Sequence, residues 1–112
     1  MVNSKIKTYF NFLKRSNKII YGYDQIKNYN KKAYLIISSY CFSDKEKLIK
    51  KASLLNCKLY ETDIETLSIL LETQNCKAIL IKNFELAKAI LKENNNLNLL
   101  REVNLIESNT KQ

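Results

Sequence analysis

The sequence predicts an α/β domain, a three-layer α/β/α sandwich around a small mixed sheet of about four strands, followed by a C-terminal tail. Three observations lead to this fold class. Strand-length apolar runs alternate with amphipathic helical patterns, the connections between them are short, and the apolar runs are almost unbroken. Unbroken apolar strands are typical of a sheet that is covered on both faces. We expect the domain to span residues 4–93, and residues 94–112 to form the tail, either as one more helix or as an adhering segment.

The first half of the expected domain contains two helices and two strands. Ile6, Phe10 and Leu13 recur at i, i+4 and i+7, which predicts an amphipathic helix over residues 4–17. The elements that follow are a short β-branched strand, a polar helix and an apolar strand, at residues 18–20, 23–32 and 33–39.

The second half is predicted from helix-start motifs and two further apolar runs. The capping boxes Ser43–Glu46 and Thr62–Glu65 each place a hydroxyl and a glutamate at the start of a helix. Asn83 is positioned to cap another helix. Two strands and this last helix complete the domain, at residues 57–61, 77–81 and 84–94.

Length and composition limit the class of protein. The 112 residues suit one domain, and the 46% of hydrophobic residues can build its core. No apolar run approaches the ~20 residues that span a bilayer. The first ten residues lack the apolar stretch of a signal peptide. We therefore expect a cytoplasmic protein with no membrane partner.

The inventory of reactive side chains argues against an enzyme. Histidine is absent, and Cys41, Cys57 and Cys76 are an odd number of cysteines without close spacing, so we expect reduced thiols and no metal site. Asp63 and Glu65 fit a helix start better than an acid/base pair. The sequence contains no glycine-rich phosphate loop. We expect no catalytic residues, no cofactor and no small-molecule substrate.

Positive charge is concentrated in the first half of the chain. Residues 1–58 carry a net charge of +10, whereas residues 59–112 carry −2. A basic half on a small domain indicates a polyanionic partner. The alternative is a lysine-rich surface that only keeps the protein in solution, because the abundance of Lys, Asn and Ile resembles that of an AT-rich genome.

Gly22, the only glycine of the chain, stands between Tyr21 and Tyr23 at the expected strand-to-helix turn. Without a Cβ atom, glycine can adopt positive φ and lets a phosphate backbone approach closely. The helix expected after it would offer free amide groups to a phosphate. A tight turn that needs glycine for its own geometry is the alternative interpretation.

The order of these elements resembles a known family. From about residue 5 to residue 93, the chain is similar to the YlxQ-type bacterial members of the ribosomal protein L-seven-Ae/L-thirty-e superfamily, many of which bind RNA kink-turns. The segments that carry the resemblance are YFNFLKRSNKIIYGYDQ, LLNCKLYETDIETLSILLE and CKAILIKNFELAKAI. The resemblance implies a small ribonucleoprotein component that binds structured RNA, with ribosomal RNA as one such partner.

The resemblance also implies where RNA is bound. In the family, the residues two, three and six places after the glycine contact sheared G·A pairs and the adjacent backbone; here they are Asp24, Gln25 and Asn28. Asn28 replaces a usual lysine, Asp24 repels phosphate, and the loop at residues 73–76, in place of the family's specificity loop, has no basic residue.

The predicted RNA surface therefore centres on the second helix. Its expected members are Gly22, Tyr23, Asp24, Gln25, Lys27 and Asn28, then Lys31 and Lys32 at the helix end, with Lys14, Arg15 and Lys18 widening the basic face. The alternative is a protein-interaction module of the same fold that has lost specific RNA binding. Its partner would bind the apolar side chains of the tail.

Overall fold

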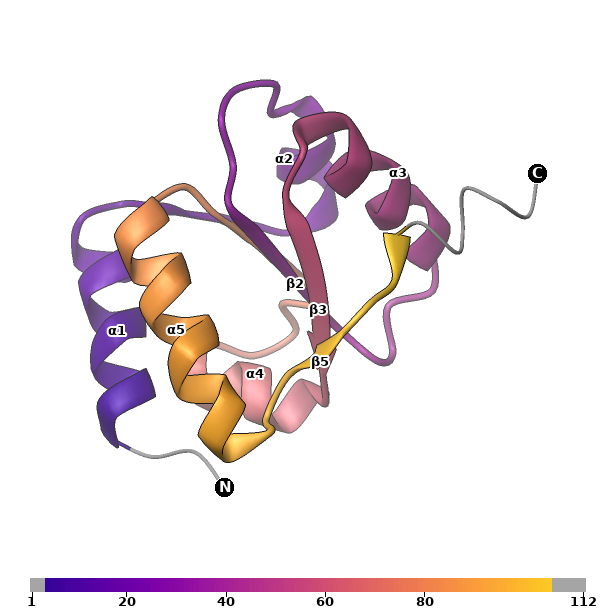
Figure 1. Ribbon diagram of the computed structural model, residues 1–112. Coiled ribbons are helices and arrows are strands. Elements are labelled where there is room, and N and C mark those ends of the chain that lie inside the picture. The colour runs from indigo at the N-terminus through magenta and orange to yellow at the C-terminus, as the bar shows by residue number, and fades with distance from the viewer. Residues whose placement is uncertain (1–3, 106–112) are drawn as a thin grey trace.

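The computed structural model describes residues 4–105 and contains three layers, with helices on both faces of a sheet (Figure 1). Helices and strands alternate along most of the chain. Their bounds are α1 Ser4–Arg15, β1 Ile19–Tyr21, α2 Tyr23–Asn28, β2 Leu35–Ser39, α3 Lys45–Leu55, β3 Lys58–Thr62, α4 Ile64–Leu71, β4 Ala78–Ile81, α5 Phe84–Leu97 and β5 Arg101–Glu102.

The sheet is mixed and has the strand order β1-β4-β2-β3-β5. The pair β2–β3 is parallel, whereas β4 is antiparallel to both β1 and β2, and β5 is antiparallel to β3. Helices α1, α4 and α5 cover one face of the sheet, and α2 and α3 cover the other (Figure 1). The predicted α/β/α fold is confirmed, with a fifth strand because β5 extends the sheet beyond β3.

The core has two halves, one on each face of the sheet. Strand β2 shows the division, since Leu35 and Ile37 pack beneath α1, α4 and α5, whereas Ile36 packs beneath α2 and α3. All three side chains are fully buried. Burial of one such side chain stabilises the fold by about 1.5 to 3 kcal/mol. The unbroken apolar strands of the sequence are thus explained by a sheet that is covered on both sides.

The two predicted capping boxes are wrong, because each helix begins one residue later than the box requires. Asp44 and Asp63 are the N-cap residues of α3 and α4, and the Asp44 side chain makes no capping hydrogen bond. Thr62 ends β3 instead, and its Oγ1 donates a hydrogen bond of 2.9 Å to the Leu99 carbonyl oxygen. Asn83 caps α5 as predicted, since its Oδ1 accepts a hydrogen bond of 2.8 Å from the Leu86 N–H.

Helix α2 is shorter than predicted. It ends at Asn28, and Tyr29 continues the chain in an extended conformation. The Tyr29 hydroxyl donates a hydrogen bond of 2.6 Å to the Lys32 carbonyl oxygen, within the loop that leads to β2. Lys31 and Lys32 therefore lie in this loop and not at a helix end.

The segment after α5 lies along β3 as an extended chain. Helix α5 continues to Leu97, and the buried Asn94 side chain exchanges two hydrogen bonds with the Leu100 backbone, at 2.7 and 2.9 Å. Leu100 is buried in the core, and Val103 and Leu105 pack against the half beneath α2 and α3. The described part of the tail is thus folded onto its own domain; Ile106, the last apolar residue predicted there, lies outside the described residues.

Candidate nucleic-acid interface

Gly22 forms the turn between β1 and α2, and its backbone conformation requires glycine. Its angles are φ 84° and ψ 150°, and its N–H donates a hydrogen bond of 2.8 Å to the Ala78 carbonyl oxygen at the start of β4. No atom lies within 4 Å of the position that a Cβ would occupy. The positive φ is confirmed, and the space beside the α-carbon is open.

An open hollow of about 440 Å³ lies beside this turn, and we call it the glycine hollow. Asp24 and Gln25 line it from α2, and Asn75 and Lys77 line it from the loop that precedes β4. The hollow therefore presents a carboxylate, two amides and one ammonium group, which can together donate and accept hydrogen bonds. Its other lining residues are Tyr21, Gly22, Tyr23, Phe42, Cys76 and Ala78.

A second hollow, about 240 Å³ in volume, lies between α2 and α3, and we call it the lysine groove. Its residues come from both helices: Tyr23, Lys27, Lys47, Lys50, Lys51 and Leu54. None of these six side chains is acidic. Tyr23 lines both the lysine groove and the glycine hollow, so the two are neighbours across its ring.

The lysine groove was predicted only in part. Sequence reasoning named Lys27 and Tyr23, but not the three lysines of α3. A signal was present, because Lys47, Lys50 and Lys51 are spaced at i, i+3 and i+4 and therefore share one helix face. Lys77 of the glycine hollow was not predicted either.

The basic residues predicted on α1 do not join this surface. The Lys14 ammonium group lies 3.0 Å from a carboxylate oxygen of Glu72, and this hydrogen-bonded pair lowers the pKa of the Glu72 carboxyl. The Arg15 guanidinium lies 5.2 Å from the centre of the Phe12 ring. Helix α1 belongs to the layer opposite α2, so Lys14 and Arg15 lie across the sheet from the lysine groove (Figure 1).

The remaining predicted residues lie around α2 without lining either hollow. Lys18 precedes β1, at the end of that strand opposite Gly22. Asn28 ends α2, and Lys31 and Lys32 follow it in the loop. The structure thus brings together Gly22, Tyr23, Asp24, Gln25 and Lys27.

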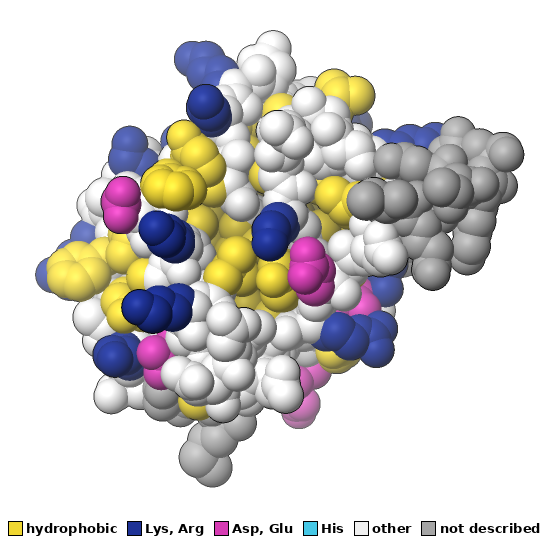
Figure 2. Space-filling view, in the orientation of Figure 1, with side chains coloured by type: hydrophobic (Ala, Val, Ile, Leu, Met, Phe, Trp, Pro, Cys, Tyr) yellow, Lys and Arg dark blue, Asp and Glu magenta, His cyan; other side chains and the backbone are white. Residues whose placement is uncertain are grey.

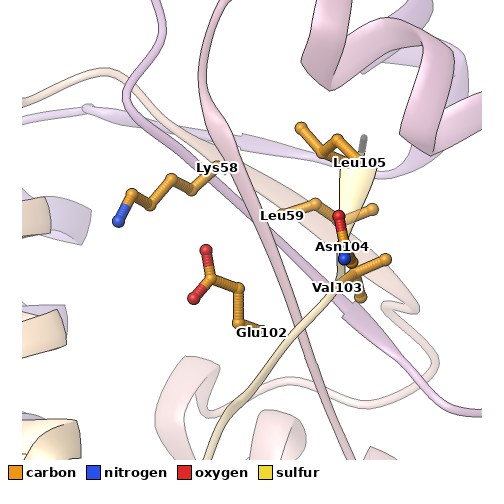
Figure 3. Close-up of a pocket in the computed structure, with 6 residues that line it drawn as sticks. All are labelled: Lys58, Leu59, Glu102, Val103, Asn104 and Leu105. Atoms are coloured by element: carbon orange, nitrogen blue, oxygen red, sulfur yellow. The ribbon is translucent and has the colours of Figure 1, made fainter. Parts of the chain in front are cut away.

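Two other hollows suit a polyanion less well. Between α5 and β3, hydrophobic side chains gather at the centre of the face in Figure 2, with basic side chains beside them. The second of these hollows lies at the sheet edge beside β5. There Lys58 of β3 and Glu102 of β5 lie on the same side of β3, so a carboxylate is close to the one cation that lines this hollow (Figure 3). The hollow between α5 and β3 holds two lysines, Lys58 and Lys88, among mainly apolar side chains, and neither hollow gathers as many lysines as the lysine groove.

Burial makes two of the three cysteines, Cys57 and Cys76, poor candidates for a reactive thiolate. Burial raises the pKa of Cys57 to about 11 and also raises the pKa of Cys76. A raised pKa keeps a thiol protonated and unreactive at neutral pH. Within residues 4–105 no group of three or more Cys, Asp or Glu side chains is arranged to hold a metal ion, and no helix is long and apolar enough to cross a membrane.

Comparison with known proteins gives similarities to solved structures and none to a protein family. No protein-family model matches the sequence, and no curated protein matches it. Among solved structures, a protein of unknown function from Bacillus halodurans is similar, with a TM-score of 0.66 and 15% sequence identity. The similarity covers 80% of this chain and 96% of that chain. At this identity the match supports the fold alone.

Proposed function

We propose that this protein binds structured RNA through the glycine hollow and the lysine groove, with ribosomal RNA as the partner class. The observation that carries the proposal is the lysine groove, where two helices contribute four lysines and no carboxylate. Close ammonium groups repel one another, and a phosphate backbone relieves that repulsion while its counterions are released.

Charge pairing elsewhere strengthens this assignment. Glu72 forms ion pairs with both Lys7 and Lys14. The buried Glu61 carboxylate forms ion pairs with both Lys45 and Arg101. These basic side chains are partly neutralised within the fold. Among the described residues, the lysine groove takes part in one ion pair, in which the Asp44 carboxylate lies 3.8 Å from the Lys47 ammonium group.

The glycine hollow supplies the groups that would recognise RNA structure. Gln25 and Asn75 offer amides that can donate to and accept from base edges, and Asp24 can accept from guanine N–H groups. Lys31 and Lys32 follow α2 and stay part of the predicted RNA surface. The resemblance to kink-turn-binding proteins supports RNA as the polyanion, and the proposal includes a cytoplasmic location and a binding role without catalysis.

Salt-dependent binding tests the proposal. Filter-binding titrations use a kink-turn RNA and a duplex of the same length, at several salt concentrations. In the variant K27Q/K47Q/K50Q, each lost phosphate contact should lower the slope of log affinity against log salt by about 0.7 to 0.9. The affinity for the kink-turn RNA should fall with it.

The matched control is K82Q/K88Q/K92Q, which removes the same charge at and before α5. These residues line neither the lysine groove nor the glycine hollow, so this variant should keep most of the salt slope. If both triple variants lose affinity equally, the binding is diffuse electrostatics. If the wild-type protein binds neither RNA at low salt, the proposal is wrong and a protein-interaction role takes its place.

A further inference from the structure

We propose that the lysine groove holds an unpaired nucleotide of the bound RNA, with its base on the Tyr23 ring and its phosphates on Lys47 and Lys50. This inference rests on the proposed function and specifies which part of the RNA the groove takes. The base would lie over an apolar floor between α2 and α3, and the flanking phosphates would lie at the rim.

The floor of the groove is suited to a flat ring. Tyr23 is half-buried, and its ring packs against the Phe42 ring at a centroid distance of 5.7 Å and an angle of 51°. This contact holds the ring in place, and the Tyr23 side chain also lines the groove. Leu54, on α3, is 80% exposed and adds an apolar surface beside the Tyr23 ring in the groove. A site for phosphate alone would need neither side chain.

The rim of the groove carries the cations. Lys51 is already engaged, because its ammonium group donates a hydrogen bond of 3.0 Å to the Lys27 carbonyl oxygen and so joins α3 to the end of α2. Lys27, Lys47 and Lys50 are exposed. Among the described residues, the Lys27 and Lys50 ammonium groups make no ion pair. Lys51 thus shapes the groove. Lys27 and Lys50 are available to a ligand, and the exposed Lys47 shares its charge with Asp44 at 3.8 Å.

Size and position favour one unpaired nucleotide over a duplex. At about 240 Å³, the groove is smaller than the ~300 to 1,000 Å³ sites that enclose drug-sized ligands. Bases within a duplex are stacked on one another and cannot reach an aromatic side chain, whereas unpaired bases can. Tyr23 directly follows Gly22 and lines both hollows. An RNA strand that leaves a paired region at the glycine hollow can therefore continue directly into the lysine groove.

The test compares two RNAs that share one kink-turn stem. One is blunt, and the other carries a short single-stranded oligouridine extension. Tyr23→Leu removes the stacking surface but stays apolar, and Tyr23→Phe keeps the ring as the matched control. We expect Tyr23→Leu to weaken binding of the extended RNA roughly tenfold more than binding of the blunt RNA, which meets Tyr23 only where it lines the glycine hollow. Tyr23→Phe should bind both RNAs as the wild-type does.

A second measurement uses the unaltered protein, so it does not depend on a variant that folds. A 5-bromouridine in the extension should form a photocrosslink to the peptide that contains Tyr23. If the wild-type protein binds both RNAs equally and the crosslink forms elsewhere, the inference is wrong while RNA binding stands. If it binds neither RNA, the proposed function fails, and the inference fails with it.

Discussion

The backbone angles of Gly22, φ 84° and ψ 150°, lie in a region that side chains with a Cβ adopt only under strain. Among residues 4–105, five non-glycine residues also have positive φ, and four of them are asparagines. All five have φ between 56° and 67°, and those at the ends of α3, α4 and α5 are left-handed helical caps. Asparagine tolerates that conformation, but not the extended one of Gly22.

Gly22→Ala should therefore lower the free energy of unfolding by about 1 to 3 kcal/mol. The cause is backbone strain and not crowding, because no atom lies within 4 Å of the new Cβ. Urea denaturation measures the change. Asn56→Gly, at a left-handed residue with φ 58°, is the control and should alter stability by less than about 1 kcal/mol. Equal losses in both variants would contradict the conformational explanation.

At the scale of the elements, the N-caps of α3 and α4 provide a matched comparison. Asp63 accepts hydrogen bonds from the Thr66 N–H at 2.7 Å and from the Thr66 hydroxyl at 3.1 Å. Asp44 occupies the same place on α3 but makes no capping hydrogen bond. Both aspartates therefore occupy the N-cap position of a helix, but only Asp63 makes a capping hydrogen bond.

Asp63→Ala should cost about 0.5 to 2 kcal/mol of stability, as the loss of a working N-cap does. Asp44→Ala should cost less, since it removes only a 3.8 Å ion pair with Lys47 on the surface. Thermal unfolding followed by circular dichroism ranks the two variants. A larger loss from Asp44→Ala would show that the capping geometry does not decide the stability of these helix ends.

The same helix ends show what the sequence could predict. The apolar periodicity located the helices and most strands, because it directly records which side chains are buried. The capping box at Thr62 failed because its hydroxyl has another partner: Thr62 donates to the backbone at Leu99, a residue 37 positions away. The end of α2 was missed because Tyr29 leaves the helix without a proline or glycine to mark the stop.

The candidate site was predictable where it depends on local sequence. Gly22 and its neighbours follow one another along the chain, so a resemblance in that stretch identified half of the surface. The lysines of α3 belong to the candidate site only because α3 packs beside α2. The spacing of residues along one helix does not predict which other helix it packs against. Lys14 was misplaced for the same reason, since its partner Glu72 is 58 residues away.

At the scale of the whole molecule, Glu61 connects three elements. Its side chain is 1% exposed, and its carboxylate pairs with Lys45 of α3 and, at 2.7 Å, with Arg101 of β5. Burial alone would raise the pKa of this carboxyl, but the hydrogen bonds and charges of Lys45 and Arg101 outweigh it and hold the pKa below its usual value. The ionised form of Glu61 therefore stabilises the native arrangement of α3, β3 and β5.

The sign of the pH dependence follows from this lowered pKa. The stabilisation is complete above the unfolded-state pKa of about 4.3 and is lost as the pH falls through the lower folded-state pKa. Glu61→Gln should lower stability at neutral pH by about 1 to 2 kcal/mol, because both cations stay partly hydrated. Its deficit relative to the wild-type should shrink below about pH 4.

Denaturation at a series of pH values measures this difference. Glu85→Gln, on the exposed first turn of α5, removes one carboxylate without a described ion pair and should show a much smaller deficit at neutral pH. A Glu61→Gln deficit that persists unchanged in acid would indicate that shape, and not charge, holds the three elements together.

The strand order sets when this domain can form during synthesis. Strand β4 lies between β1 and β2 although it is fourth along the chain, and the Gly22 N–H is held by Ala78, the first residue of β4. A nascent chain that has emerged only to residue 77 has no partner for β1 and no anchor for the glycine turn. The two walls of the glycine hollow meet only after β4 has left the ribosome, so the complete surface cannot engage RNA while the first three strands are still being made.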